Sequence, residues 1–342
     1  MNKTLNREKW EELFDGFTIV DCVILTEQVF GFVLVEVLDG DSTSATTRFL
    51  NISSHQPMED RFAYAEGNTF SFPNIAMSQS PLEYVAVDTK SNVYSASIER
   101  MGEEAAIDQL LDMSTYNGLI GIINKLVRVA GKIYALGDYR KIYRRIGFEQ
   151  WIELGTEGHG VPPPAYINDE DDSSMEYGFE DMSGFSSDDM YAVGGEGDVW
   201  RFDGAKWHQC PVPTNASLKT VCCAGDGVVY ITEINGTVWA GRTDTWRRIA
   251  GADISPAYAP VDSFWFNDRL YLGGQEGIWT VDAINGRVVR LQEIETDAPN
   301  VTNSGRLDIS VDGNFLLTAG PYGACIHDGT AWRRLFSAFD YL

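Results

Sequence analysis

Residues 190–207 read MYAVGGEGDVWRFDGAKW, and this stretch decides the fold. Apolar residues alternate up to Gly194-Gly195, and a second apolar run spans residues 199–202. Alternation with a period of two is typical of a β-strand, and paired glycines favour a tight connection between two strands. Asp203-Gly204 then predicts a hairpin turn, so that Trp207 begins a further strand.

The same order of residues recurs along the chain. The position of Tyr191 repeats after steps of 40, 57, 39, 41 and 46 residues, and the anchors are Tyr94 (the weakest copy), Tyr134, Tyr191, Tyr230, Tyr271 and Leu317. Steps of roughly 40 residues match one four-stranded blade of a β-propeller. The step of 57 requires an insertion, and the acidic stretch at about residues 157–180 supplies one.

The N-terminal part of the chain adds strands for one more blade. Strand-like runs occupy residues 18–25, 29–37, 47–52 and 62–72. We therefore predict an all-β chain that forms a single β-propeller over residues 17–342, with seven blades favoured over six. Short helices are expected to decorate it, one in an N-terminal helical segment at residues 1–16 and one over residues 102–113.

Three copies of the repeat resemble those of a known group of proteins. Residues 134–151, 191–207 and 230–246 resemble the Y-x-φ-G-x-x-G-x-φ-W-x-x-D-G-x-x-W repeats of many bacterial β-propeller proteins, and more loosely kelch and WD40 repeats. The likeness covers roughly residues 120–336. It implies a fold and no particular function, because propellers host binding modules, enzymes and scaffolds. The paired Gly-His and Trp-Asp of WD40 repeats and the long loop of kelch repeats are missing.

The charge of the chain restricts its partners. The 342 residues contain 26 Lys and Arg against 50 Asp and Glu, which gives a formal net charge of −24. Such a surface repels phosphate, so nucleic acid and anionic membranes are not expected as partners. A charged partner should be basic. The sequence begins without an apolar signal segment and contains no run that could span a bilayer, so we expect a cytoplasmic protein.

Catalytic and cofactor motifs are not found. The four His residues occur in unrelated contexts, and the five Cys residues lack the spacing of a zinc site or a disulfide framework. We therefore predict no catalytic residues, no metal and no cofactor, and we interpret the cysteines as buried thiols. His159 lies in a Gly- and Pro-rich loop, where a solvated side chain is favoured over one that lines a site. Trp200, Trp239 and Trp279 are expected to pack between blades.

Charge order along the chain points to a binding segment. Residues 146–200 contain no Lys or Arg, whereas basic residues cluster at 125–145. These two regions could pair as solvated surface, or the acidic one could dock a basic protein. The residues predicted to bind the partner are Asp169, Glu170, Asp171, Asp172 and Glu176. Calcium binding by this run is less favoured, because no Gly occupies the middle as in an EF-hand loop.

Two classes of function follow from these observations. The first is a non-enzymatic, protein-binding propeller that is a monomer on its own. Its specific form is an immunity-type inhibitor of a basic bacterial toxin such as a nuclease, whose active site the carboxylates would cover. The alternative is a carbohydrate-active hydrolase or lyase with its site at the ring axis, and a scaffold within a larger assembly is a third interpretation.

Overall fold

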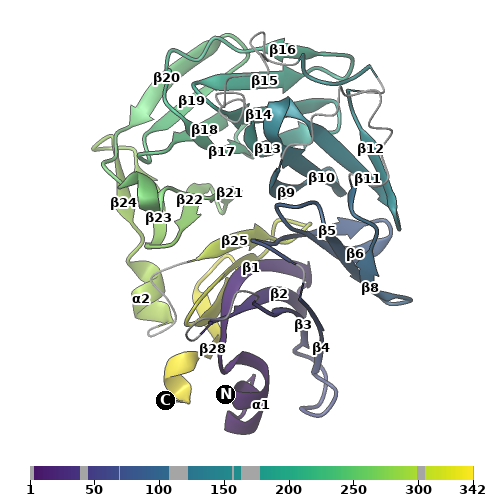
Figure 1. Ribbon diagram of the computed structural model, residues 1–342. Helices are drawn as coiled ribbons and strands as arrows, with labels where there is room; N and C mark the ends of the chain where they lie inside the picture. The colour runs from purple at the N-terminus through teal and green to yellow at the C-terminus, as the bar shows by residue number, and fades with distance from the viewer. Residues whose placement is uncertain are drawn as a thin grey trace.

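Seven four-stranded antiparallel sheets surround a central axis (Figure 1). The computed structural model describes residues 4–38, 45–68, 70–107, 122–155, 158–162, 178–298 and 305–341. Each sheet is built from four consecutive strands, and the first strand of each blade lines the axis. The seven-bladed all-β propeller predicted from the repeat is thus confirmed.

The blades are numbered 1 to 7 in chain order. Blades 1 to 3 comprise β1–β4 (Phe17–Thr26, Val29–Glu36, Thr47–Ser53, Phe62–Gly67), β5–β8 (Asn74–Gln79, Leu82–Val87, Val93–Ser97, Met101–Glu104) and β9–β12 (Ile123–Val129, Lys132–Gly137, Ile142–Gly147, Gln150–Glu153). Blades 4 and 5 comprise β13–β16 (Phe179–Ser186, Asp189–Gly194, Asp198–Phe202, Trp207–Gln209) and β17–β20 (Leu218–Cys223, Val229–Glu233, Val238–Arg242, Thr245–Ala250). Blades 6 and 7 comprise β21–β24 (Asp262–Phe266, Arg269–Gly274, Gly277–Asp282, Arg287–Arg290) and β25–β28 (Arg306–Ile309, Leu316–Gly320, Gly323–His327, Trp332–Ser337).

Glycines of the repeat stand where two backbone segments of the same blade come too close to leave room for a side chain. A Cβ at Gly194 would collide with the carbonyl oxygen of Gly178, which precedes the first strand of the same blade. Gly197 has a φ of 70°, in the left-handed region that favours glycine. These positions therefore hold β14 and β15 in the tight arrangement that the sequence predicts.

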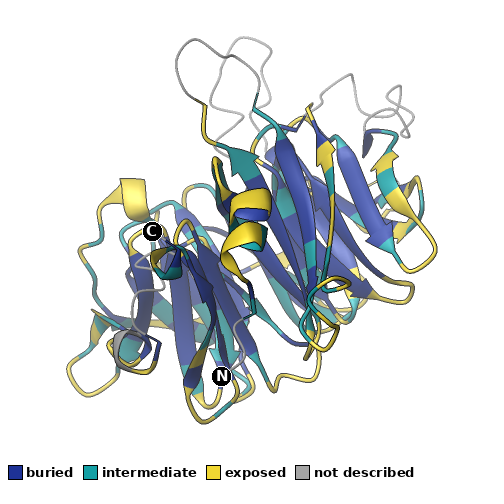
Figure 2. Cartoon of the chain, turned by 90° about the horizontal axis from the view of Figure 1, so that it is seen from below, coloured by how far each residue is buried: buried dark blue, intermediate teal, exposed yellow. Residues whose placement is uncertain are grey.

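Large aromatic side chains fill the wedges between blades. Trp200 packs in a cluster shared by blades 3 and 4, Trp239 in one shared by blades 4 and 5, and Trp279 in one shared by blades 5 and 6. This confirms the predicted position of the three tryptophans. Figure 2 shows the buried residues concentrated along the strands and the exposed ones in the turns.

One anchor of the repeat was assigned to the wrong strand. Tyr134, Tyr191, Tyr230 and Tyr271 lie on the second strands of their blades, whereas Tyr94 lies on β7, a third strand. The residue in blade 2 that lies on a second strand is Tyr84, on β6, and it is fully buried. Second and third strands share the same apolar alternation, so the pattern alone does not distinguish them.

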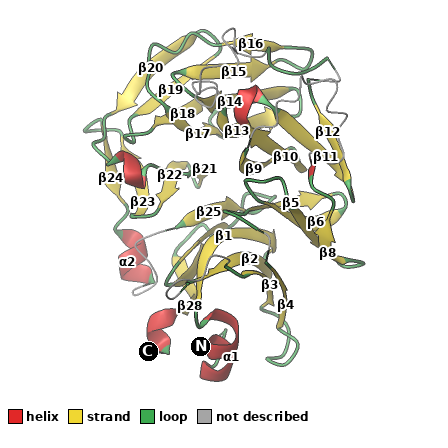
Figure 3. Ribbon diagram, viewed as in Figure 1, coloured by secondary structure: helices red, strands yellow, loops and turns green. Residues whose placement is uncertain are grey.

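Of the two predicted helices, the structure contains the first and not the first part of the second (Figure 3). Helix α1 (Arg7–Phe14) is present, and its N-cap Asn6 accepts a hydrogen bond from the backbone N–H of Lys9 at 2.8 Å. The helix predicted over residues 102–113 is wrong in its first part, because Glu103 and Glu104 belong to β8. Its remainder falls largely outside the described residues. A short helix, α2 (Glu293–Asp297), lies between blades 6 and 7.

The ends of the chain meet at the seam between blades 7 and 1. The ring of Trp10 on α1 stacks on Phe14 and on Tyr341, with centroids 4.7 and 5.1 Å apart. Phe14 also packs on Phe336 of β28, and the Tyr341 hydroxyl donates to the carbonyl oxygen of Leu5 at 2.8 Å. Helix α1 and the C-terminal turn therefore close the ring together, and among the strands that the structure describes none is shared between the first and last blades.

Candidate functional site

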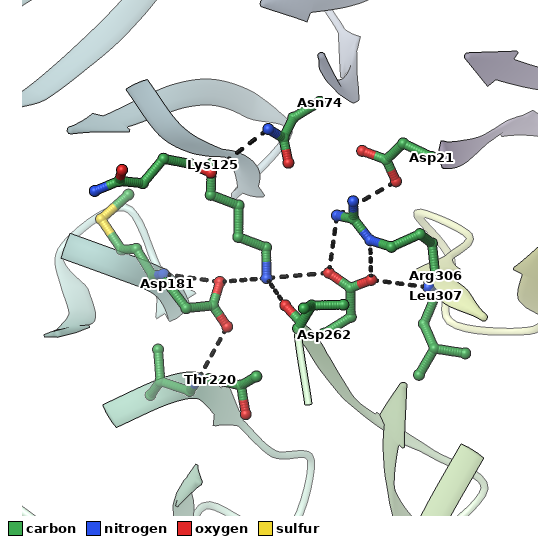
Figure 4. A network of polar contacts seen from close by, with 12 residues as sticks. Asp21, Asn74, Lys125, Asp181, Thr220, Asp262, Arg306 and Leu307 are labelled. Atoms are coloured by element: carbon green, nitrogen blue, oxygen red, sulfur yellow. Dashed lines mark hydrogen bonds and ion pairs between the residues drawn. The ribbon is translucent and has the colours of Figure 1, made fainter. Parts of the chain in front are cut away.

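A network of buried charges occupies the ring axis (Figure 4). The Lys125 ammonium on β9 lies 3.0 Å from Asp181 of blade 4 and 3.1 Å from Asp262 of blade 6. Arg306 on β25 donates from Nε to Asp262 at 2.7 Å and lies 3.4 Å from Asp21 of blade 1. Five side chains from five blades are thereby joined across the axis.

The aspartates also connect neighbouring blades through backbone N–H groups. Asp21 accepts from Ile75 N at 2.8 Å, which joins blade 1 to blade 2. Asp181 accepts from Val221 N at 2.9 Å, which joins blade 4 to blade 5. In both first strands the pairing register shifts immediately before the aspartate. A register shift of this kind is a β-bulge, which changes the direction of a side chain. Here the bulge directs the aspartate toward the next blade.

The same connection recurs in blades 6 and 7. Asp262 accepts from Leu307 N at 3.0 Å, and Asp308 accepts from Ile24 N at 2.7 Å across the closing seam. We call these four aspartates the axial clips. Each of them fixes the first strand of the following blade.

Burial and the neighbouring cations shift the pKa values of the axial clips in opposite directions. Burial raises the pKa of Asp21, Asp181 and Asp308 to about 6, although each has a cationic neighbour. For Asp262 burial also opposes ionisation, but Arg306 and Lys125 together hold its pKa well below the ordinary range. The network therefore has a firmly ionised centre with more easily protonated aspartates around it.

Both carboxylate oxygens of every clip are occupied by donors. Asp181, for example, receives Lys125 and the Met182 N–H on Oδ1 and the Val221 N–H on Oδ2. General acid or base catalysis needs a carboxyl group that can reach a substrate proton. The clips are already bonded on all sides, so their chemistry is that of structural links.

Two cavities lie along the axis on the two sides of this network. One has a volume of 310 Å³ and is walled by first-strand residues, including Met77, Met182 and Trp265. The other has a volume of 260 Å³ and is bordered by Lys219, Glu180 and the loop at residues 256–261. Lys125 and Arg306 line both.

One face of the ring carries the long connections. Because the strands of a blade alternate in direction, every connection between blades emerges at the face where the first strands begin, which we call the entry face. Residues 105–122, 154–178 and 291–305 are the longest of these connections. On the opposite face, first and second strands are joined by two-residue turns in most blades, as at 27–28 and 130–131, and by the short loops 224–228 and 310–315 in blades 5 and 7. Apolar side chains are exposed on the entry face, among them Phe72, Ile122, Tyr258 and Tyr322.

The residues predicted to bind a partner lie outside the described part of the chain. In the sequence they fall between β12 and β13, whose adjoining ends lie at the entry face; they are Asp169, Glu170, Asp171, Asp172 and Glu176. The start of this connection is fixed: Trp207 donates to the His159 carbonyl at 2.7 Å, and Arg140 donates to that of Pro162 at 3.0 Å. His159 itself is exposed.

The basic cluster at residues 125–145 pairs in part with the acidic region at 146–200, as one interpretation of the sequence expects, but the pairs Lys125–Asp181 and Arg140–Asp198 are largely buried and not solvated. Arg140 makes a two-pronged ion pair with Asp198, at 2.6 and 3.0 Å. Arg145 is buried and bonded to both Glu83 and Glu104 of blade 2. With Lys125 at the axis, these side chains stabilise contacts inside the ring.

The axial charges were missed at the level of sequence. The signal for one of them was present, since Asp21 interrupts the apolar run Ile19-Val20-Asp21-Cys22-Val23. A charged residue in an apolar strand is either an edge residue or a buried, paired one. For Asp262 and Arg306 the local sequence offers no comparable contrast.

No three His, Cys, Asp or Glu side chains gather as metal ligands among the described residues. The five cysteines are free thiols, of which Cys223 alone is only partly buried. In the same part of the chain, no helix has the length and apolar character needed to cross a membrane.

Comparison with known proteins gives one relative by sequence. Over 174 residues the chain is 34% identical to the immune protein Tsi7 of Pseudomonas aeruginosa PAO1, an alignment that covers 51% of this chain and 53% of the relative. The chain thus matches about half the length of that protein. No protein-family profile matches the sequence.

Solved structures with the same fold are distant in sequence. The WD40 β-propeller domain of Doa1 has a TM-score of 0.58 at 10% identity, covering 90% of this chain and 91% of that domain. YCF48 bound to a D1 peptide has a TM-score of 0.55 at 11% identity, covering 94% and 93%. PorZ of Porphyromonas gingivalis has a TM-score of 0.52 at 12% identity, covering 94% of this chain and 39% of PorZ. These similarities establish the propeller fold alone.

Proposed function

We propose that this chain is a non-enzymatic, immunity-type protein that binds and inhibits a bacterial toxin protein. The observation that carries the proposal is the 34% identity to the immune protein Tsi7 over 174 residues. The propeller is compatible with this role, because it offers rigid faces on which variable connections can contact a protein.

The axial clips give no support to the carbohydrate-active alternative. A glycoside hydrolase needs one carboxyl group as acid and a second as base or nucleophile. The four axial clips, Asp21, Asp181, Asp262 and Asp308, are each held by backbone N–H groups and a cation. Glu180, which borders the second cavity, is paired with Lys219 at 2.6 Å. The carbohydrate-active alternative thus gains no supporting observation.

The entry face is the proposed contact surface for the toxin. It combines the longest connections with exposed aromatic and aliphatic side chains. We propose that Asp169, Glu170, Asp171, Asp172 and Glu176 in one of those connections contact a basic region of the toxin, because opposite charge speeds encounter and rejects wrong partners. We further propose that the protein acts as a monomer in the cytoplasm.

A neutralisation assay tests this function. The product of each gene adjacent to the one encoding this chain is expressed in an indicator bacterium, alone and together with the chain. The proposal expects one product to arrest growth alone, growth to be restored by the chain, and the two purified proteins to form a stable complex. Growth arrest that persists at equal expression of the chain for every such product would contradict it.

A further inference from the structure

Charge is segregated among the outermost strands of the seven blades. In blades 1 to 3 the charged residues of these strands are all acidic: Glu66 on β4, Glu103 and Glu104 on β8, and Glu153 on β12. In blades 5 to 7 they are all arginines: Arg247 and Arg248 on β20, Arg287 and Arg290 on β24, and Arg333 and Arg334 on β28. We call the latter set the arginine wall.

The two sides differ in how far their charges are neutralised. Three of the four acids are paired or buried, since Glu66 pairs with Arg48, Glu104 pairs with Arg145 and Glu153 is buried, whereas Glu103 is exposed. By contrast, the most open arginines of the wall are exposed and form no ion pair within the described part of the chain; they are Arg247, Arg248, Arg287 and Arg333. A concentration of exposed positive charge is unexpected on a chain with a net charge of −24, although Arg287 lies opposite Asp282 of β23 and attracts its carboxylate.

The part of the wall in blades 5 and 6 is joined along the rim and is partly apolar. Blades diverge toward the rim, yet the ends of β20 and β24 are joined by hydrogen bonds from Gly251 N to Gly286 O at 3.0 Å and from Val288 N to Gly251 O at 3.1 Å. In blade 6, Ile284 is 95% exposed and Val289 is 38% exposed. Arginine beside exposed apolar side chains is the composition that protein interfaces favour.

We propose that the arginine wall is a docking surface for an acidic segment of a partner protein. Arginine binds carboxylates through two parallel N–H donors, and arginine clusters recognise acidic motifs. A protein segment fits better than nucleic acid, because the net charge of the whole molecule repels a phosphate backbone at long range. The surface is distinct from the acidic segment of the proposed function and opposite to it in sign.

A binding experiment with defined probes tests the wall directly. The probe is a short fluorescein-labelled peptide in which Glu alternates with Val, and its neutral counterpart carries Gln in place of Glu. Fluorescence anisotropy at low and high salt compares the wild type with the Arg247→Glu, Arg287→Glu double variant. The matched control is the Arg7→Glu, Lys206→Glu double variant, which changes the net charge equally at exposed positions elsewhere.

The wild type is expected to bind the Glu peptide in preference to the Gln peptide. The wall variant should bind it at least about tenfold more weakly, and the control should change by less than about twofold, as expected for charge acting at a local site. Melting temperatures establish that both variants fold, and an Arg247→Gln, Arg287→Gln variant gives a milder second comparison.

Three results would overturn the proposal. These are no binding of the Glu peptide by the wild type, equal weakening in wall and control variants, or tighter binding of a short DNA duplex that the wall variant loses. Neutralisation of a toxin is measured separately, so failure of this surface leaves the proposed immunity function testable, and the reverse also holds.

Discussion

The indole ring of Trp10 stacks on the phenol ring of Tyr341, with centroids 5.1 Å apart and planes 12° apart. This contact joins the N-terminal helix to the end of the last blade. Together with the hydrogen bond that the Ile24 N–H donates to Asp308, it holds the seam at which the ring closes. The seam is where the ring depends on side-chain contacts between the two ends of the chain.

Replacing Trp10 should therefore weaken the seam before other blade interfaces. We expect Trp10→Ala to lower the free energy of unfolding by about 2 kcal/mol, less than for a fully buried tryptophan, and to speed hydrogen exchange in β1 and β25. Tyr258→Ala, at an exposed aromatic distant from the seam, is the control. Exchange that accelerates equally in all blades would show that α1 does not act at the seam.

The tryptophans between blades should contribute more to the free energy of unfolding than Trp10 does. We expect Trp200→Ala and Trp279→Ala to cost about 3 to 5 kcal/mol each, because both side chains are nearly buried among apolar neighbours. Denaturant unfolding measures the loss. An unchanged midpoint in both variants would mean that these side chains are dispensable for packing.

Removing an axial clip should also lower the free energy of unfolding. Asp262→Ala leaves Lys125 and Arg306 without their shared carboxylate, and breaking a buried ion pair costs about 3 to 5 kcal/mol. Asp253→Ala removes an exposed carboxylate as a control, for which we expect less than about 0.5 kcal/mol. Equal melting temperatures for the two variants would contradict a structural role for the clip.

Stability should rise on mild acidification. The pKa values of Asp21, Asp181 and Asp308 are raised to about 6, above the ordinary value near 3.8, so the folded chain binds protons more tightly than the unfolded one. Their contribution is complete below about pH 4 and is lost as the pH rises through 6.

The measurement is the free energy of unfolding between pH 5 and 7. Lower net charge acts in the same direction, so Asp181→Asn, which removes one titrating clip, is compared with Asp188→Asn, which removes an exposed acid. We expect the slope of stability with pH to flatten only in the first variant. Identical slopes would assign the effect to net charge alone.

The acidic connection should affect association more than folding. Reversal of Asp169, Asp171 and Asp172 to Lys should slow binding to the toxin found by neutralisation, and the defect should shrink at high salt, where screening is strong. The control reverses Glu59, Asp60 and Glu99, which are exposed on turns of the opposite face. Equal association rates for both triple variants would remove the support for this segment.

The fold could be predicted because each blade carries its own local signals. Gly194 and Trp200 mark a turn and a wedge that recur in most blades, so the period is visible without any alignment. Tyr94 was misassigned because two strands of one blade share an alternation. Glu103 and Glu104 resemble the start of a helix in sequence, but they lie on a strand. There Glu104 accepts hydrogen bonds from Arg145 of the next blade, a tertiary contact that propensity does not report.

The axial network could not be derived in the same way. Lys125 meets Asp181 and Asp262 only because three blades converge, and their positions lie 56 and 137 residues further along the chain. The sequence favours a solvated surface for the basic residues at 125–145, whereas Lys125, Arg140 and Arg145 form largely buried ion pairs inside the ring. Sequence order shows that charges are close in the chain and not that they are close in space.

Each blade is one uninterrupted run of four strands, and this has an evolutionary consequence. A duplication or deletion whose ends fall in the connections between blades transfers a whole sheet together with its turns and its wedge residues. Relatives are therefore expected to differ in length by units of roughly 40 residues, the size of a single blade. Such a change would renew part of the binding surface while leaving the closure between the first and last sheets as it was.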